Sequence, residues 1–183
     1  MAPHIAPAAS CLLTLLFATP TFAAAPPETP VDAAADARPS ILDRQPMPRV
    51  YSAGQPNADD WASIAAHGVT TVIDLRPDAE RPGRDEAAEV QAAGLAYRHI
   101  PIAGPQDLTP DAARTLWQAI DAAPGKVLVH CASGNRAGAL LAIAAAREGG
   151  MAPARALELG REAGMTSTES RARAVLGLPA GDP

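Results

Sequence analysis

The chain has 183 residues, 48% of them hydrophobic and 19% charged, and its formal net charge at pH 7 is −5. This size and composition suit a single folded domain with an additional tail. The acidic balance argues against nucleic acid and against an anionic membrane surface as the main partner, although it leaves room for a local basic pocket.

The first segment has the pattern of a secretory signal peptide. Residues 8–17 form a short apolar run, and small residues at 23–25 follow it as a site for signal peptidase. The run is too short to span a bilayer. We therefore expect a signal peptide at residues 1–25, a periplasmic or secreted mature protein, and no membrane span after cleavage. Because no Lys or Arg precedes the run, a misplaced start codon or a disordered Ala-rich leader is the alternative.

Residues 26–48 are rich in Pro, Ala and Asp, and this composition predicts a disordered, solvated linker. The folded domain is then expected at residues 49–178, and residues 179–183 form a short tail. Cleavage of the signal peptide would remove Cys11 and leave Cys131 as the only cysteine. The mature chain can therefore contain neither an intramolecular disulfide nor a CxxC redox centre.

Strand-like and helical patterns alternate along the domain. A strand at 50–52 is followed by a helix for which Asn57 is the expected N-cap, with Asp60 in the capping-box position and Gly68 as the stop. The next strand is expected at 70–75. In chain order, the remaining elements are expected as a helix at 86–93, a strand at 96–102, a helix that starts at Thr109-Pro110 and ends before Pro124-Gly125, a strand at 126–129, and helices at 139–144, 153–163 and 167–176.

At the start of the last helix, Thr166 and Glu169 have the spacing of a second capping box. The alternation of strands and helices predicts an α/β fold in which helices flank a single, mostly parallel sheet. Ligands in such folds bind at the carboxyl ends of the strands. The loop that follows the strand at 126–129 is therefore a candidate site.

That loop is a candidate anion site at the start of a helix. Backbone amides at a helix N-terminus lack intrahelical partners, and the helix dipole adds partial positive charge at the same spot. Gly134 permits the backbone angles that turn amides toward an anion, and Arg136 offers a fork of donors that matches a tetrahedral oxyanion. We expect phosphate to be bound by the loop residues Ala132, Ser133, Gly134, Asn135, Arg136 and Ala137.

The cysteine at the start of this loop is a candidate nucleophile. Lowering the pKa of a free thiol from about 8.5 to about 5.5 requires roughly 4 kcal/mol, whereas a helix terminus supplies about 0.3–1 kcal/mol and at most about 2. Arg136, the inward amides and a supporting contribution from His130 have to supply the rest, so that Cys131 is largely thiolate at neutral pH. The structural alternative is a buried thiol at the end of a strand.

Two further segments carry recognisable patterns, Tyr51-Ser52-Ala53-Gly54-Gln55-Pro56 and Gly68-Val69-Thr70-Thr71-Val72-Ile73-Asp74-Leu75-Arg76. Together with the loop from His130 to Arg136, they resemble the cysteine-dependent phosphatases of the dual-specificity type. The resemblance is strongest to the bacterial branch named after the phosphatase-like domain of beta-lactamase hydrolase-like proteins, and it extends over most of residues 49–178. It implies a cysteine-phosphatase-like fold and hydrolysis of phosphate monoesters.

The mechanism that this resemblance implies is a double displacement. Cys131 attacks phosphorus to form a phosphocysteine, while Arg136 and the loop amides hold the equatorial oxygens. A carboxylic acid protonates the leaving alcohol and then activates water. The matching position is Asp107, in the loop after the strand at 96–102, and its alternative role is that of a helix-start residue before Thr109.

Other polar residues have simpler interpretations. Asp74 and Arg76 lie at a strand end, where we expect a structural pair rather than pocket lining. None of the 4 histidines has the spacing of a metal ligand, and no Walker loop or dinucleotide fingerprint is present, so neither a metal nor a cofactor is expected. The expected partner is a phosphorylated small molecule or a phosphoprotein, and the sequence leaves the oligomeric state open.

Two features depart from the phosphatase pattern. Four residues separate Cys131 from Arg136, where the phosphatase loop has five, and the shorter count is typical of rhodanese-like sulfurtransferases. Position 137 is Ala, where phosphatases have a Ser or Thr whose hydroxyl assists release of the thiolate. Two alternatives therefore stay open, a sulfurtransferase that carries a persulfide on Cys131 and a non-catalytic module that binds a phosphorylated or sulfated ligand.

Overall fold

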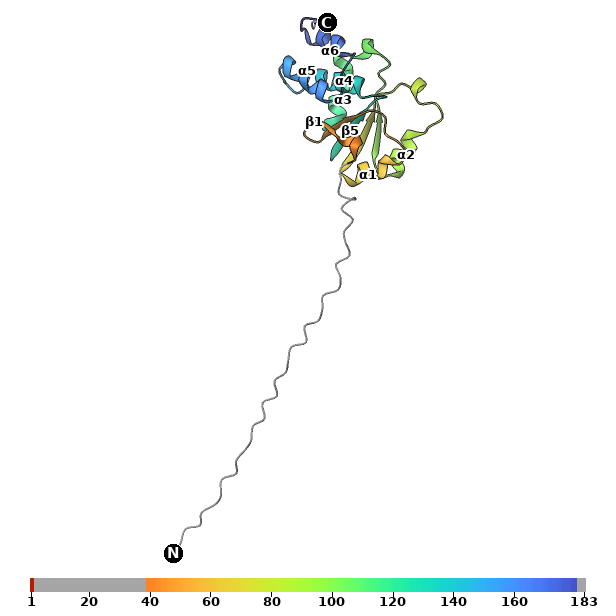
Figure 1. Cartoon of the computed structure of the whole chain (residues 1–183), viewed down its shortest axis with the longest axis vertical. Coiled ribbons are helices and arrows are strands. Elements are labelled where there is room, and N and C mark those ends of the chain that lie inside the picture. The colour runs from red at the N-terminus through yellow and green to blue at the C-terminus, as the bar shows by residue number, and fades with distance from the viewer. Residues whose placement is uncertain (2–38, 181–183) are drawn as a thin grey trace. The chain divides into compact units, whose positions relative to one another are not determined.

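The structure is a computed structural model that describes Met1 and residues 39–180 (Figure 1). Apart from Met1, the expected signal peptide, most of the expected linker and residues 181–183 lie outside the described residues. The elements described below all belong to the compact unit Ala37–Pro183. Among the described residues, no helix combines the length and the apolar character that crossing a membrane requires.

One sheet of five strands in the order β1-β2-β5-β3-β4 forms the centre of this unit. Strands β2 (Val50–Ala53), β5 (Lys126–His130), β3 (Val69–Asp74) and β4 (Ala96–His99) run parallel to one another. Strand β1 (Arg44–Met47) pairs with β2 in the antiparallel direction. This arrangement confirms the expected α/β fold with a mostly parallel sheet.

Helices cover both faces of the sheet (Figure 1). They are α1 (Asp60–Ala66), α2 (Glu86–Ala92), α3 (Pro110–Asp121), α4 (Asn135–Arg147), α5 (Pro153–Glu162) and α6 (Glu169–Leu176). The side chains of β5 alternate between two hydrophobic clusters, since Leu128 packs in one and Val127 and Val129 pack in the other. Helices α1 and α2 contribute to the first cluster, and α3 to α6 contribute to the second.

Helix α4 follows the expected phosphate loop, and it is enclosed by its neighbours. Every residue from Ala137 to Ala145 is buried, because α3, α5 and α6 all pack on this helix. Small residues allow the close approach, since a Cβ on Gly138 would lie 2.5 Å from the carbonyl oxygen of Gly160. Packing therefore fixes the N-terminal end of α4 relative to the sheet.

The C-terminal part of the expected linker is folded, so the expected domain boundary at residue 49 was wrong. Leu42 is fully buried, and β1 pairs with β2. Strand β1 contains Pro46, which is compatible with its position at the edge of the sheet, where a missing N–H breaks no ladder. The Pro-rich composition of this segment therefore concealed an edge strand.

Two further expected element ends differ from the structure. Helix α1 begins at Asp60 with Asp59 as its N-cap, although the carboxylate of Asp60 still accepts a hydrogen bond from the N–H of Asn57 at 2.7 Å. Strand β4 ends at His99, short of the expected residue 102. The backbone hydrogen bonds nevertheless continue across Pro101, since the N–H of Ile100 donates to the carbonyl of Asp74 at 3.0 Å and the N–H of Ile102 donates to the carbonyl of Leu75 at 2.9 Å.

The expected capping box at the start of α6 was wrong as well. Thr168 is the N-cap of this helix instead of Thr166. The carboxylate of Glu169 does not reach back to the backbone, because it accepts hydrogen bonds from Arg161 and Arg173. These bonds, of which those from Arg161 matter most, lower the pKa of Glu169 to about 2. Charge pairing with Arg161 and Arg173 therefore replaces the expected cap.

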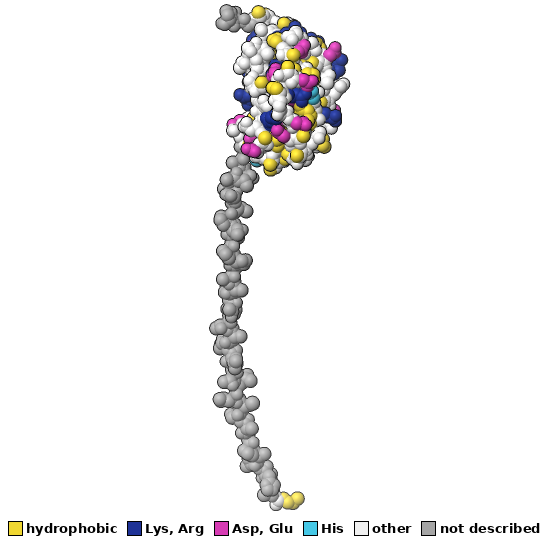
Figure 2. Space-filling model, turned by 90° about the vertical axis from the view of Figure 1, so that its right-hand side faces the viewer, with side chains coloured by type: hydrophobic (Ala, Val, Ile, Leu, Met, Phe, Trp, Pro, Cys, Tyr) yellow, Lys and Arg dark blue, Asp and Glu magenta, His cyan; other side chains and the backbone are white. Residues whose placement is uncertain are grey.

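Charged side chains of both signs lie interspersed on the face of the domain that Figure 2 shows. Elsewhere on the domain, charges are paired locally, as Arg155 of α5 is with Glu158 and Glu162. Interspersed charges create no extended field of one sign on that face. The absence of nucleic acid as a partner stays a prediction from the sequence.

Candidate active site

The candidate residues lie where three parallel strands end side by side. His130, at the end of β5, is in register with Ala53 of β2 and Asp74 of β3. Gly134 then starts α4 as its N-cap with a φ of 92°, a left-handed conformation that glycine adopts without strain. The loop that begins at Cys131 therefore connects the carboxyl end of a central strand to a helix N-terminus, as expected.

The thiol of Cys131 lies beneath this loop. Its side chain is 1% exposed, and its sulfur accepts a hydrogen bond from the backbone N–H of Gly134 at 3.2 Å. The first turn of α4 closes with a bond of 2.8 Å from the N–H of Gly138 to the carbonyl of Gly134. The amides between these two glycines have no intrahelical acceptor. Together with the helix dipole, they make an anion site beside the thiol.

The segment 51–56, which carries part of the family resemblance, supports the loop backbone. The N–H of Gln55 donates to the carbonyl of Ala132 at 3.2 Å. Gly54 lies against the same carbonyl, since a Cβ on Gly54 would be 3.1 Å from that oxygen. The pattern that the sequence singled out is therefore a structural support for the candidate site.

The guanidinium of Arg136 is held in one orientation. Nη1 donates to the carbonyl of Ile102 at 2.7 Å and to Oε1 of Glu80 at 2.8 Å, and Nη2 donates to Oε2 of Glu80 at 2.6 Å. A guanidinium has five N–H groups, so one N–H on Nε and one on Nη2 remain without a carbonyl or carboxylate partner. These two N–H groups lie on the same edge of the planar guanidinium, where they can donate to two oxygens of one phosphate.

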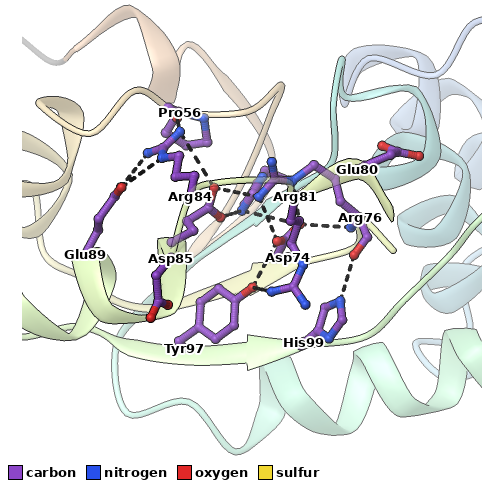
Figure 3. A network of polar contacts seen from close by, with 12 residues as sticks. Pro56, Asp74, Arg76, Glu80, Arg81, Arg84, Asp85, Glu89, Tyr97 and His99 are labelled. Carbon is purple, nitrogen blue, oxygen red and sulfur yellow. Dashed lines mark hydrogen bonds and ion pairs between the residues drawn. The ribbon is translucent and has the colours of Figure 1, made fainter. Parts of the chain in front are cut away.

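This pairing keeps Arg136 charged. The hydrogen bonds to Glu80 are the main cause that raises the pKa of Arg136 above its ordinary value, and the nearby Cys131 adds to the effect. Glu80 ends the 3-10 turn Asp78–Glu80 in the loop after β3. Figure 3 shows Glu80 at the edge of the polar network, pointing away from Asp74. The sequence analysis missed Glu80, because residue spacing does not distinguish it from the other acidic residues of this loop.

Asp107, the expected acid, caps a turn with one of its oxygens. Oδ2 accepts hydrogen bonds from the N–H groups of Ala103 at 2.9 Å and Gly104 at 3.2 Å. Oδ1 accepts no hydrogen bond from the described residues. The same loop contains Ile102, whose carbonyl accepts a hydrogen bond from Arg136. Asp107 therefore has a structural contact and one oxygen that remains available.

Most of the other loop residues can contribute only through their backbone. Oδ1 of Asn135 accepts hydrogen bonds from the N–H of Thr168 at 3.3 Å and from its hydroxyl at 2.8 Å, so this side chain supports the segment before α6. Ala132 has no polar side-chain atom, and the side chain of Ser133 is exposed. Ala137 is fully buried and offers no hydroxyl near the thiol. Of the expected phosphate ligands, Arg136 is the one that brings a charged side chain.

A buried polar cluster lies behind the loop (Figure 3). Oδ1 of Asp74 accepts the backbone N–H and Nε of Arg76 at 2.9 and 3.0 Å, while Oδ2 accepts Nη2 of Arg76 and the hydroxyl of Tyr97, both at 2.9 Å. The expected structural pair of Asp74 and Arg76 is therefore confirmed. Burial alone would raise the pKa of Asp74, but the hydrogen bonds from Arg76 help to outweigh it, and the pKa lies below its ordinary value.

Among the described residues, Asp74, Glu86 and His130 form the group that could hold a metal ion, with ligand atoms within 4.8 Å of one another. Arg76 competes for this position, because its Nη2 also donates to Oε2 of Glu86 at 2.6 Å. Asp74 has no acceptor position left. A cation would have to displace the buried guanidinium, so the arrangement favours a charge cluster over a metal centre.

Residues 44–148 match the family described as beta-lactamase hydrolase-like protein, phosphatase-like domain. The chain belongs to this family. A beta-lactamase hydrolase-like protein of Xylella fastidiosa (strain Temecula1 / ATCC 700964) is 40% identical over 107 residues, which are 56% of this chain and 25% of that protein. The chain therefore spans about a quarter of the length of the curated relatives that it matches.

Solved structures share the fold. A protein of Neisseria meningitidis z2491 that is named as a candidate phosphatase is 27% identical, with a TM-score of 0.61 over 73% of this chain and 94% of that one. Human DUSP28 is 19% identical, with a TM-score of 0.56 over 73% of this chain and 91% of that one, a likeness that shows the fold alone. The expected fold of the dual-specificity type is thereby confirmed.

The left-handed glycine of the loop leads to the first prediction. Tungstate, a tetrahedral oxyanion like phosphate, serves as the probe of the proposed anion site. Replacing Gly134 by Ala is expected to weaken tungstate binding about tenfold. A side chain at a φ of 92° is strained, and its Cβ would lie 3.4 Å from the carbonyl oxygen of Ala53, so the amides would tilt away from the sulfur. Protection of Cys131 by tungstate against iodoacetamide measures the binding.

Gly150→Ala is the matched control for this variant. Gly150 has a φ of 68°, and a Cβ there would meet no atom within 4 Å, so the substitution brings similar backbone strain away from the loop. This variant should be protected by tungstate as well as the unmodified protein is. Equal protection of folded Gly134→Ala and Gly150→Ala would contradict the assignment of the anion site.

Proposed function

We propose that this protein is an exported, cysteine-dependent phosphatase that acts through a phosphocysteine on Cys131. Its substrate would be a phosphorylated small molecule or a phosphoprotein. The observation that carries the proposal is the N–H of Gly134, which points at the buried sulfur of Cys131 at the N-terminus of α4. A thiolate at this position is stabilised by the amides and the helix dipole. Membership in the phosphatase-like family supports a phosphatase-type hydrolase in general.

The reaction would proceed in two displacements. The thiolate of Cys131 attacks phosphorus as the bond to the leaving oxygen breaks, and Asp107 gives its proton to that oxygen. The free N–H edge of Arg136 and the amides of α4 bind the nonbridging oxygens. Asp107 then takes a proton from water, whose oxygen attacks the phosphocysteine. This second step releases inorganic phosphate and restores the thiolate.

The short loop favours a second candidate, a rhodanese-like sulfurtransferase. One residue fewer between Cys131 and Arg136 shortens the chain by up to about 3.3 Å, which is comparable to the width of a bound oxyanion. A persulfide on Cys131 would place a single sulfur above the amides, and this smaller group fits a smaller loop. For a phosphatase, the short loop and the missing hydroxyl at Ala137 imply slow turnover.

The second prediction separates these chemistries. The purified mature protein should hydrolyse p-nitrophenyl phosphate slowly, and thiosulfate:cyanide transfer should be slower still. Cys131→Ser should abolish hydrolysis and keep some tungstate binding, because Arg136 and the amides remain. Faster sulfur transfer with a persulfide on Cys131 would favour the transferase. If neither reaction depends on Cys131 while tungstate still raises the Tm, the protein is a binding module.

The third prediction concerns the acid. Asp107→Asn should slow hydrolysis of an alkyl phosphate far more than that of p-nitrophenyl phosphate, because nitrophenolate leaves with little need for a proton. Asp111→Asn is the matched control, since Asp111 is exposed on α3 and pairs with Arg114. Equal losses on both substrates in Asp107→Asn would assign Asp107 to turn capping alone.

The fourth prediction concerns export, which rests on the apolar run at 8–17 and the small residues after it. Protein isolated from its native cells should have a mature N-terminus between Ala24 and Pro26, which mass spectrometry of the intact chain measures. An intact Met1 on cytoplasmic material would contradict both the proposed localisation and the expectation that Cys131 is the only cysteine of the mature chain.

A further inference from the structure

His130, the residue before the candidate nucleophile, is fully buried against a carboxylate. Its Nε2 lies 2.9 Å from Oε1 of Glu86 and 3.8 Å from Oδ1 of Asp74. Neither ring nitrogen of His130 makes an aligned hydrogen bond with a described residue, and the same holds for Oε1 of Glu86. Buried polar atoms without hydrogen bonds are unfavourable, so this contact needs another source of stabilisation.

Charge balance within the cluster supplies that stabilisation. Asp74 and Glu86 each bring one negative charge, and Arg76, which is hydrogen-bonded to both, brings one positive charge. The sum over these buried side chains is negative, and an uncompensated buried charge is strongly unfavourable. A proton on His130 neutralises the cluster and makes its contact with Glu86 an ion pair.

The nearest additional cation is already engaged. Nη1 of Arg84 approaches Oε2 of Glu86 at 3.9 Å, but this side chain is 25% exposed. Its guanidinium makes three hydrogen bonds to Glu89 at 2.6 to 3.0 Å. Arg84 therefore neutralises Glu89 and leaves the charge on Glu86 to its buried neighbours.

Arg81, in the loop after β3, also faces the cluster, because its Nη1 donates to the hydroxyl of Tyr97 at 3.1 Å. Its charge is balanced outside the cluster, since its Nη2 pairs with the carboxylate of Asp78. From β4, Nε2 of His99 contacts the backbone carbonyl of Arg76 at 2.7 Å and not a carboxylate.

The remaining groups that face the cluster come from β4 and α1. From β4, the hydroxyl of Tyr97 donates to Asp74, and burial together with the charge of Asp74 raises the pKa of Tyr97, so this group stays neutral. From α1, the ring of Trp61 lies 6.4 Å from that of His130 between centroids. His130 is therefore the group that can complete the charge balance, and Cys131 is its neighbour in the chain.

We propose that Glu86 is a positioning residue that holds a proton on His130, and that the resulting positive charge stabilises the thiolate of Cys131. Its catalytic consequence rests on the proposed phosphatase function. Glu86 is assigned this role rather than Asp74, because all acceptor positions of Asp74 are occupied. Oε1 of Glu86 is open toward the ring, and Oε2 is fixed by Arg76 at 2.6 Å. Glu86 also begins α2, where the helix dipole favours a carboxylate.

The variant Glu86→Gln tests this proposal, because Gln keeps the size of the side chain and an acceptor for Arg76 but removes the charge. The rate of alkylation of Cys131 by iodoacetamide is measured against pH. The midpoint should rise by about one unit, a tenfold loss of thiolate below the midpoint. Glu89→Gln removes a charge from the same helix and should leave the midpoint unchanged. An unchanged midpoint in folded Glu86→Gln would overturn the proposal.

A second variant shows whether Glu86 acts through His130. His130→Gln should raise the alkylation midpoint by itself, and adding Glu86→Gln in that background should change it no further. Full additivity of the two shifts would overturn the proposal, because a residue that affects only the packing of the loop would act independently of the imidazole charge.

A measurement on the unmodified protein keeps the proposal testable if a variant fails to fold. Nitrogen NMR of His130 at pH 7 should show both ring nitrogens protonated, and one unprotonated nitrogen would overturn the proposal. These measurements do not require turnover. A shifted midpoint in a protein without hydrolytic activity would refute the proposed phosphatase and leave the role of Glu86 intact.

Discussion

The hydrogen bond from the N–H of Gly134 to the sulfur of Cys131 depends on a junction between two buried elements. Strand β5 lies between two parallel strands, and α4 is enclosed from Ala137 onward by three other helices. The short loop from Cys131 to the left-handed Gly134 connects the two, so neither can shift without disturbing the core. The N–H of Gly134 is therefore oriented toward the thiol by the fold itself, and the proposed binding of an anion would require little reorganisation.

Charged side chains act on this junction from one loop. The segment between β3 and α2 contains Glu80, which bonds to Arg136 at the front of the phosphate loop. Just beyond its other end, Glu86 at the start of α2 contacts His130 behind the loop. The guanidinium of Arg136 and, as proposed above, the imidazole of His130 bring positive charge to the site. The sheet and helices thus fix the backbone of the site, while acidic residues in and just after the loop that follows β3 contact its basic side chains.

Features that depend on neighbours in the chain could be predicted from the sequence. Gly68 and Gly94 end their helices with positive φ values of 80° and 79°, and Thr109 caps α3 as expected. Long-range partners could not be predicted. Glu86 is one of several acidic residues at the start of α2 and in the charged loop before it, and only the folded sheet brings it to His130. The edge strand β1 was missed for a related reason, since its pairing with β2 overrides a Pro-rich local composition.

The central claim is that the anion site of α4 serves a covalent phosphoryl transfer, and trapping the intermediate tests it most directly. The slow release expected from Ala137 should allow the phosphorylated enzyme to accumulate when an aryl phosphate is mixed with the protein and the reaction is quenched rapidly. Mass spectrometry of the quenched chain should find one phosphoryl group on the peptide that contains Cys131. Release of inorganic phosphate without any phosphoryl group on that peptide, or a persulfide in its place, would contradict the account.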